Sequence, residues 1–429
     1  MDALIAGMVG SGEPGVAVSI MEGGRSVYRA CHGLADVGWR QPVAADTVFR
    51  IASVGKMVTG VTCLVLAREG LLDLEAPIGR YLPEYPAATA TRISVRHLLT
   101  HTSGIPNFLT QPGWRPSASR LDHTPEQLLA VFADLPLDFA PGSRYGYSNS
   151  GYLVLDMIIA RVTAQPLDQV LPQRVFQPAG MTDARLLSDA DVVARAARGY
   201  QRADDRWLNA EYLSLTIAGS GGGIGATLAD MEAFDVAMRD HRLLDPADHA
   251  RMVTRVQLAD GRTEGYGLGC VLTTYRGHTV VSHAGGINGF SSFYGRLPDR
   301  DLSVVVLSNR DGFRAATLAR GILDAIAELS PAAAASDAHG PIPPPPAAWL
   351  GTYADTLGRA ELTMCDGALL VEKDGASHRF LALAAHQYVD EADPDVHLHL
   401  HNAEPDKALT ISYPFTWFTG YHTSQGQPV

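Results

Sequence analysis

The 429-residue chain has few cysteines, little lysine and no excess of positive charge. Acidic residues outnumber basic residues by 46 to 34, and no basic stripe is interleaved with aromatic residues, so we do not expect a nucleic-acid partner. The cysteines stand singly and show no C-x-x-C spacing, which disfavours a disulfide framework and a zinc site. They are Cys31, Cys63, Cys270 and Cys365.

Long apolar runs are also missing. The longest, around residues 58–67 and 304–307, fall far short of the roughly 18 residues that a membrane span needs. The N-terminal segment has no Lys or Arg before its apolar stretch and is soon interrupted by glycines, unlike a secretory signal. We therefore predict a soluble, cytoplasmic protein with no membrane partner.

Lysine occurs only as Lys56, Lys373 and Lys407, which leaves arginine at every other basic position. Arginine is effectively always protonated in proteins, whereas a buried lysine can lose its proton. A site that needs a neutral amine cannot accept the arginine that this chain uses almost everywhere else. Lys56 is therefore a candidate functional residue, although a single lysine also has to fall somewhere by chance.

The order of predicted elements indicates an α/β (α+β) catalytic domain over residues 1–330. A strand, turn and strand follow residue 15, and an antiparallel meander of four strands spans residues 266–309. Helical segments separated by Pro and Gly loops fill the region from about 72 to 255. We expect one antiparallel sheet, built from two distant parts of the chain and flanked by helices, with this helical subdomain inserted.

A Pro- and Ala-rich linker is predicted at residues 331–346, followed by a small all-β domain at residues 347–429 that docks on the catalytic domain. One of its strands carries three histidines at alternate positions, about 7 Å apart, which is awkward for a tetrahedral metal ion. These are His397, His399 and His401. The glycine-rich segment 219–225 lacks the lysine of a P-loop. We predict no metal and no cofactor.

Three short motifs carry the chemistry. Ser53 and Lys56 are three residues apart at the start of a predicted helix, so that the amine can take the proton of the hydroxyl. Tyr147 and Asn149 lie in a polar turn before another helix, where a tyrosine can relay a proton and an asparagine can hold an amide. The third motif, His283-Ala284-Gly285-Gly286, is predicted to end a strand, where small residues let a substrate backbone approach.

In this order and these settings the three motifs resemble those of the penicillin-recognising serine hydrolases, over about residues 10–330. The similar branch contains class C β-lactamases, D-aminopeptidases and lactamase-fold esterases. The resemblance implies a class C β-lactamase-like sheet, a nucleophilic Ser53, a proton relay by Lys56 and Tyr147, and an Asn149 that orients substrate. It also implies an oxyanion hole formed by the backbone N–H groups of Ser53 and Gly286.

The third motif departs from the commonest pattern because His283 stands where β-lactamases and carboxypeptidases usually carry a lysine. A mostly neutral histidine anchors a substrate carboxylate less well, which favours amides, esters or N-terminal D-residues. We predict a serine hydrolase that acts as an amidase, D-aminopeptidase or esterase on a small-molecule or peptide substrate, with a homo-oligomer possible. The alternatives are a β-lactamase, an acyltransferase and a penicillin-binding sensor without turnover. No G-x-S-x-G elbow occurs, which argues against an α/β-hydrolase.

Overall fold

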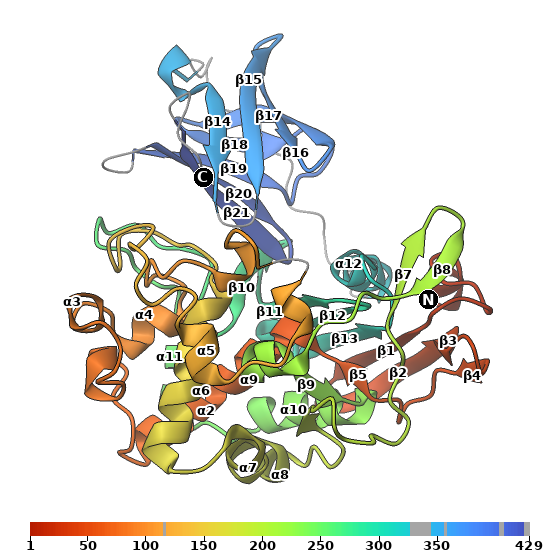
Figure 1. Ribbon diagram of the computed structural model, residues 1–429. Helices are drawn as coiled ribbons and strands as arrows, with labels where there is room; N and C mark the ends of the chain where they lie inside the picture. The colour runs from red at the N-terminus through yellow and green to blue at the C-terminus, as the bar shows by residue number, and fades with distance from the viewer. Residues whose placement is uncertain (115–116, 327–344, 356–357, 403–406, 424–429) are drawn as a thin grey trace.

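The computed structural model contains a mixed α/β catalytic unit, residues 1–326, and a C-terminal β-barrel (Figure 1). Only the last two residues of the predicted linker fall within the described part of the chain. The structure describes residues 1–114, 117–326, 345–355, 358–402 and 407–423.

The central sheet of the catalytic unit is antiparallel and has the strand order β10-β11-β12-β13-β1-β2. The N-terminal hairpin joins the later meander through β1 and β13, where Val18 lies opposite Val306. The prediction of one sheet from two distant parts of the chain is therefore confirmed. Its strands are β1 (Val16–Glu22), β2 (Arg25–His32), β10 (Val271–Tyr275), β11 (His278–Ile287), β12 (Phe290–Leu297) and β13 (Leu302–Ser308).

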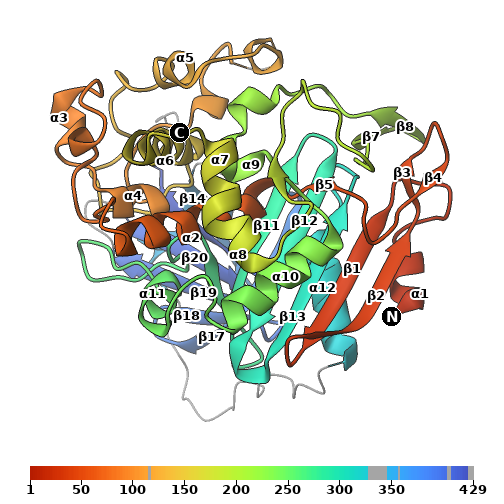
Figure 2. The same ribbon diagram turned by 90° about the horizontal axis from the view of Figure 1, so that it is seen from below.

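Both faces of this sheet are covered, which explains why β1 and β13 are almost entirely buried. Successive side chains of a strand point to opposite faces. Val16 and Val18 pack in a core with α1 (Asp2–Ala6) and α12 (Ala315–Ile326), whereas Ala17 belongs to the larger core that includes α10 (Leu228–Arg239). Figure 2 shows α10 and α12 on opposite faces of the sheet.

Two long helices lie beside the sheet: α2 (Gly55–Arg68), just before the predicted helical region, and α6 (Asn149–Thr163) within it. Both are buried over most of their length, so neither has a clear polar face. The predicted helical region, residues 72–255, is less helical than expected because it also contains short strands at residues 185–186, 200–203, 206–209 and 224–226. The other helices are α3 (Ala87–Ala90), α4 (Val95–Leu99), α5 (Pro125–Leu129), α7 (Leu167–Leu171), α8 (Gln177–Ala179), α9 (Gly219–Gly222) and α11 (Pro246–Met252). The small sheets are β3–β4 (Leu34–Asp36, Gln41–Pro42), β5-β9-β6 (Phe49–Arg50, Ile224–Ala226, Arg185–Leu186) and β7–β8 (Tyr200–Ala203, Arg206–Asn209).

The C-terminal domain is a closed barrel of eight antiparallel strands with its own apolar core. Sequence patterns predict five of these strands and miss β14, β18 and β21. Closure depends on β14 pairing with β21, more than 60 residues later, where Ala354 lies opposite Tyr421. The strands are β14 (Gly351–Ala354), β15 (Arg359–Cys365), β16 (Ala368–Lys373), β17 (Ala376–Ala384), β18 (Gln387–Asp390), β19 (His397–Asn402), β20 (Lys407–Tyr413) and β21 (Thr416–His422).

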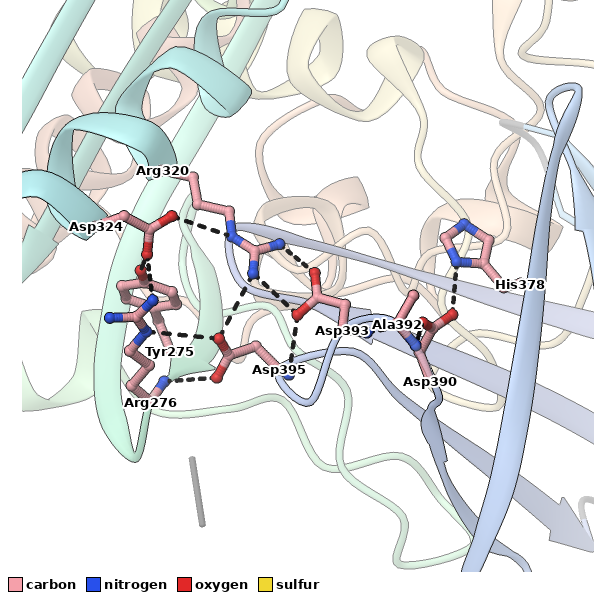
Figure 3. Close-up of polar contacts among 9 residues, drawn as sticks. All are labelled: Tyr275, Arg276, Arg320, Asp324, His378, Asp390, Ala392, Asp393 and Asp395. Carbon is pink, nitrogen blue, oxygen red and sulfur yellow. Dashed lines mark hydrogen bonds and ion pairs between the residues drawn. The ribbon is translucent and has the colours of Figure 1, made fainter. Parts of the chain in front are cut away.

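The barrel docks over the β10 end of the central sheet (Figure 1). One contact is an ion-pair cluster, which we call the polar latch: Arg276 and Arg320 of the catalytic unit with Asp324, Asp393 and Asp395 (Figure 3). The Arg320 guanidinium donates to Asp393 at 2.9 Å, and the Arg276 backbone N–H donates to Asp395 at 3.1 Å.

Among the described helices, none has the length and apolar character that a bilayer crossing requires.

Candidate active site

Ser53 lies in a single 3₁₀ turn, Ala52–Val54, that leads directly into α2. Ala52 has a φ of +48°. This left-handed backbone conformation is energetically unfavourable for any residue that has a Cβ atom. The turn is held by the sheet, because the Ser292 hydroxyl donates a hydrogen bond of 2.6 Å to the Ile51 carbonyl. Ser53 is thus fixed at the N-terminal end of a buried helix, as the sequence predicts.

The Lys56 amine is surrounded by three oxygen atoms. It lies 3.1 Å from the Ser53 hydroxyl, 3.1 Å from the side-chain oxygen of Asn149 and 3.1 Å from the Gly221 carbonyl. The residue is 0% exposed, and its amine also lies 5.1 Å from the centre of the Tyr152 ring. Since the Asn149 and Gly221 oxygens can only accept, two N–H bonds of the amine are directed away from Ser53.

Tyr147 lies next to both Ser53 and Lys56, and the centre of its ring is 4.9 Å from the Lys56 amine. Its hydroxyl donates a hydrogen bond of 2.8 Å to the Ser53 hydroxyl oxygen. The sequence places Asn149 in a turn before a helix, whereas in the structure it is the first residue of α6 and Ser148 is the N-cap. The structure brings Ser53, Lys56, Tyr147 and Asn149 into one hydrogen-bonded group.

The third motif lies within β11 and not at its end, because the strand continues to Ile287. A Cβ on Gly285 would lie 2.4 Å from the Ile51 carbonyl oxygen, so only glycine lets the strand pack against the turn that carries Ser53. Gly286 lies opposite Ser291, one pair from the two-residue Asn288–Gly289 turn. In such a hairpin this second pair directs its backbone groups away from the partner strand.

His283 is buried below this site and does not line the cavity described next. Its Nδ1 lies 2.6 Å from the Ala284 carbonyl, which can only accept, so Nδ1 carries the hydrogen. Its Nε2 then accepts from the Tyr266 hydroxyl at 2.9 Å. Burial, and then the Lys56 charge, lower the pKa of His283 to about 3, so the ring is neutral. His283 is therefore absent from the lining of the cavity, and its contact with substrate stays a prediction.

A cavity of about 370 Å³ opens above Ser53. Its described lining includes the carboxylates of Asp156 and Asp311 but no arginine or lysine. Of the predicted site residues, Ser53, Tyr147, Asn149 and Gly286 line it. Five further lining residues are aliphatic: Leu109, Leu153, Leu213, Ile217 and Ile287.

Asp156 is a cavity residue that the sequence patterns do not identify. It lies seven residues after Asn149 on α6, hence on the same face two turns later. The Ser220 backbone N–H donates to its carboxylate at 2.8 Å, and the Ser220 hydroxyl donates to the other oxygen. Burial raises the pKa of Asp156 to about 7, although these hydrogen bonds and the Lys56 charge oppose the shift. In the sequence, the one indication of a role for Asp156 is that it is a single acidic residue within the otherwise apolar run 152–159.

The glycine-rich segment 219–225 also belongs to the site, although its sequence lacks the lysine of a P-loop. Gly219 has a φ of +52°, and a Cβ there would lie 2.2 Å from the Asp156 carboxylate. Gly221 supplies the carbonyl that accepts from Lys56. Because glycines at both positions allow close approach, the segment serves as a wall of the cavity.

Metal-binding groups of three or more His, Cys, Asp or Glu side chains do not occur within the described ranges of the chain. The three barrel histidines lie along β19, and the rings of His399 and His401 stack at 6.1 Å. Burial lowers the pKa of each of the three, that of His401 to about 4.

The sheet, the buried α2 and the hydrogen-bonded group around Ser53 define a serine hydrolase of the β-lactamase fold. Comparison with known families agrees with this class. The family model described as Beta-lactamase matches residues 1–327, and the chain belongs to that family.

Named relatives lie in several enzyme groups. The chain is 35% identical over 186 residues to "Esterase EstB" of Burkholderia gladioli, which covers 41% of this chain and 47% of the esterase. It is 28% identical over 303 residues to "D-aminopeptidase" of Brucella anthropi, covering 70% and 56%. The chain therefore spans about half the length of these two relatives. A solved D-amino acid amidase from Ochrobactrum anthropi SV3 is 28% identical with a TM-score of 0.64, covering 75% of this chain and 94% of the amidase.

Proposed function

We propose that this serine hydrolase cleaves an amide or ester through an acyl-enzyme on Ser53, with Lys56 and Tyr147 moving the proton. The observation that carries the proposal is the arrangement of oxygens around the Lys56 amine. As an ammonium group, Lys56 can donate to Ser53, Asn149 and Gly221 at once. As a neutral amine it keeps the last two hydrogen bonds, and its lone pair then faces the Ser53 hydroxyl.

The same geometry therefore accommodates the residue before and after proton transfer. Lys56 takes the Ser53 proton while the serine oxygen attacks the substrate carbonyl carbon. The proton then passes to the leaving nitrogen or oxygen, with the Tyr147 hydroxyl, 2.8 Å from the serine oxygen, as the relay. Water adds to the acyl-serine ester, and its proton returns by the same route as the acid leaves and Ser53 is restored.

The developing oxyanion needs two donors near Ser53. We assign them to the backbone N–H groups of Ser53 and Gly286. Two observations support the assignment of Gly286: it lines the cavity together with Ser53, and its pair in the β11–β12 hairpin is of the type that points backbone groups away from β12.

The cavity favours an acyl group that carries both an ammonium group and an apolar side chain. The only acidic or basic lining residues in the described chain are Asp311 and Asp156, and the raised pKa of Asp156, about 7, leaves it partly ionised near neutral pH. The aliphatic lining residues provide an apolar wall. A substrate carboxylate would meet these acids and no cation, since His283 is buried and neutral. This supports a D-aminopeptidase-like or amidase-like reaction on an aminoacyl amide over a β-lactamase or carboxypeptidase reaction.

An esterase is the second candidate. The apolar wall accepts an acyl chain without an amino group, and the relative with 35% identity carries the name esterase. The two candidates differ in what they require of the acidic side chains: an aminoacyl substrate uses them, and a simple acyl ester does not.

A substrate panel tests this assignment: D- and L-phenylalanine p-nitroanilide, p-nitrophenyl butyrate and a chromogenic cephalosporin. We expect kcat/KM to be highest for a D-aminoacyl substrate among the amides, and lowest for the cephalosporin. Turnover of the cephalosporin above both anilides would contradict the proposed substrate class. Butyrate turnover without anilide turnover would favour the esterase.

Asp311→Asn sharpens the panel because Asp311 is an exposed wall residue whose removal should not disturb the fold. We expect KM for the aminoacyl substrate to rise about two- to fivefold, as for loss of an exposed ion pair, with KM for p-nitrophenyl butyrate unchanged. Asp205→Asn is the matched control, since Asp205 is fully exposed and does not line the cavity. Equal effects of both variants would refute a role for Asp311.

Lys56→Arg tests the proton transfer. We expect kcat to fall about a hundredfold or more, as far as in Lys56→Ala, because a guanidinium group does not give up its proton. An arginine variant with the turnover of the unmodified chain would leave Lys56 with the role of a positive charge alone.

A further inference from the structure

A small aromatic cluster lies directly behind the candidate active site and includes one residue of the barrel. Tyr145, Tyr266 and Val271 are buried in it, with Tyr147 and Trp417 packed against them. Trp417 belongs to barrel strand β21, and its ring centre lies 5.0 Å from that of Tyr145 and 5.8 Å from that of Tyr266. We call these residues the aromatic cluster.

The cluster contacts two of the three catalytic motifs. Tyr145 precedes Tyr147 by two residues, and the His101 ring lies between them, 5.9 Å from Tyr145 and 4.3 Å from Tyr147. The Tyr266 hydroxyl donates to His283, in the strand that carries Gly286. The Trp417 indole thus packs against Tyr145, which is close to Tyr147 in the chain, and against Tyr266, which holds His283 of the third motif.

Trp417 itself does not line the cavity, nor does any other described residue of the barrel. The described part of the barrel therefore contributes no wall to this cavity. An influence of Trp417 on catalysis would therefore be indirect, through the rings of Tyr145 and Tyr266 against which it packs.

The strand that carries Trp417 is anchored on both sides of it. Phe415, in the β20–β21 turn, is 4% exposed and packs into the catalytic unit, with ring centres 5.5 Å from Tyr275 and 5.3 Å from Phe293. The Thr419 hydroxyl donates to Glu264 at 2.9 Å. This fixes the indole against the aromatic cluster, where it lies 3.1 Å from the position of a Cβ on Gly265.

We propose that Trp417 is a positioning residue for Tyr147 and for the Gly285–Gly286 segment. This inference rests on the proposed function, because it assigns Trp417 an effect on the proton relay and the oxyanion donors. Removing the indole leaves a gap behind Tyr145 and Tyr266, so that both motifs relax away from Ser53. A displacement of about 1 Å in such a site is enough to lower turnover by up to about a hundredfold.

The test is steady-state kinetics of Trp417→Leu and Trp417→Phe in the full-length chain, with p-nitrophenyl acetate as a small substrate. We expect kcat to fall about tenfold to a hundredfold in the leucine variant, with KM within about twofold, because the cavity wall is intact. The phenylalanine variant keeps an aromatic ring and should recover most of the lost kcat. It also keeps the inference testable if the leucine variant does not fold, since its own kcat should still fall about threefold.

Trp349→Leu is the matched control. Trp349 is a buried indole in the barrel core, 4% exposed, and its described ring contacts are with His386 and Lys407 of the barrel. We expect this variant to lower Tm while kcat stays unchanged. Equal loss of kcat in Trp349→Leu and Trp417→Leu, or unchanged kcat in both Trp417 variants, would overturn the inference.

Tyr147→Phe, measured in the same series, separates the two proposals. If it loses turnover while the Trp417 variants do not, the positioning role fails and the proposed function stands. If Tyr147→Phe keeps full turnover, the proposed relay fails, and with it the reason for assigning a positioning role to Trp417.

Discussion

Among the described contacts between the barrel and the catalytic unit, one region is held by charges and another by aromatic rings. In the polar latch, the side chains of Arg320 and Asp393 are 29% and 24% exposed, whereas that of Asp395 is 5% exposed (Figure 3). The aromatic region buries Phe415 almost completely and brings Trp417 against the supports of the active site. Partly exposed ion pairs contribute little to stability, whereas a buried aromatic ring contributes several kcal/mol. The aromatic region should therefore couple the barrel to catalysis, and the polar latch should mainly set its orientation.

The largest effect should follow from removing both regions together. Deleting residues 345–429 takes away Trp417 and Phe415 and exposes Tyr145, Tyr275 and Phe293. We expect kcat for p-nitrophenyl acetate to fall about a hundredfold or more, through loss of the aromatic support. Near-UV circular dichroism reports whether the shortened chain is folded. A folded shortened chain with the kcat of the full-length chain would show that the barrel has no part in positioning.

Phe415→Ala removes one buried ring from the aromatic region and leaves the charged residues of the polar latch unchanged. The free energy of unfolding should fall by about 3–5 kcal/mol, the usual cost of deleting a buried phenylalanine ring. Urea denaturation measures this loss. The control is Leu381→Ala in the same barrel, where a side chain that is 40% exposed should change stability by less than about 0.5 kcal/mol. Comparable losses in the two variants would contradict the importance of the inserted ring.

Glu264 makes the aromatic region sensitive to pH. The residue is 3% exposed, and burial raises its pKa from 4.5 to about 7, although Thr419 and Arg262 oppose the shift. The folded state then binds a proton that the unfolded chain releases near pH 4.5. Its contribution to stability is complete below about pH 4.5 and is lost as pH rises through about 7, a change of about 3 kcal/mol.

Glu264→Gln removes this dependence while the amide oxygen still accepts from Thr419. We expect the unmodified chain to lose about 3 kcal/mol more than the variant between pH 4.5 and 8. Asp156, whose pKa is also raised to about 7, titrates in both chains and cancels in the difference. Identical pH dependence of Tm in the two chains would show that Glu264 is not buried as described.

The smallest effect is expected at the polar latch. A double-mutant cycle with Arg320→Gln and Asp393→Asn should give a coupling energy of about 1 kcal/mol or less, which falls as salt is added. We expect kcat to stay unchanged in all three variants, because neither residue contacts the aromatic cluster. A loss of kcat as large as that in Trp417→Leu would remove the distinction between the two regions.

The sequence predicts best what lies close together along the chain. Ser53 and Lys56 share one helical turn, so their spacing alone indicates that the two side chains meet. The joining of the N-terminal hairpin to the meander follows from apolar strands whose two faces both need cover. The resemblance of the motifs then supplies the partners Tyr147 and Asn149, which spacing alone does not connect to Ser53.

Contacts between residues that are far apart in the chain cannot be predicted from the sequence patterns. The pattern around His283 gives no sign that Tyr266 binds its ring, because the partner depends on how a loop folds back on the strand. Asp156 follows Asn149 by two helical turns. Its place in the site becomes clear only from the folded structure, in which it lines the cavity. The barrel closes through β14 and β21, at opposite ends of the domain, so neither its closure nor the placement of Trp417 can be predicted from short strands.

The central claim is that Ser53 is the nucleophile of an acyl-enzyme that turns over. Intact-mass spectrometry of the full-length chain, after reaction with a fluorophosphonate and separately with a slowly hydrolysed p-nitrophenyl ester, tests it directly. We expect a single covalent adduct with each reagent, decay of the ester-derived adduct with return of the original mass, and no adduct in Ser53→Ala. An adduct that persists in Ser53→Ala, or no adduct in the unmodified chain, would contradict the account.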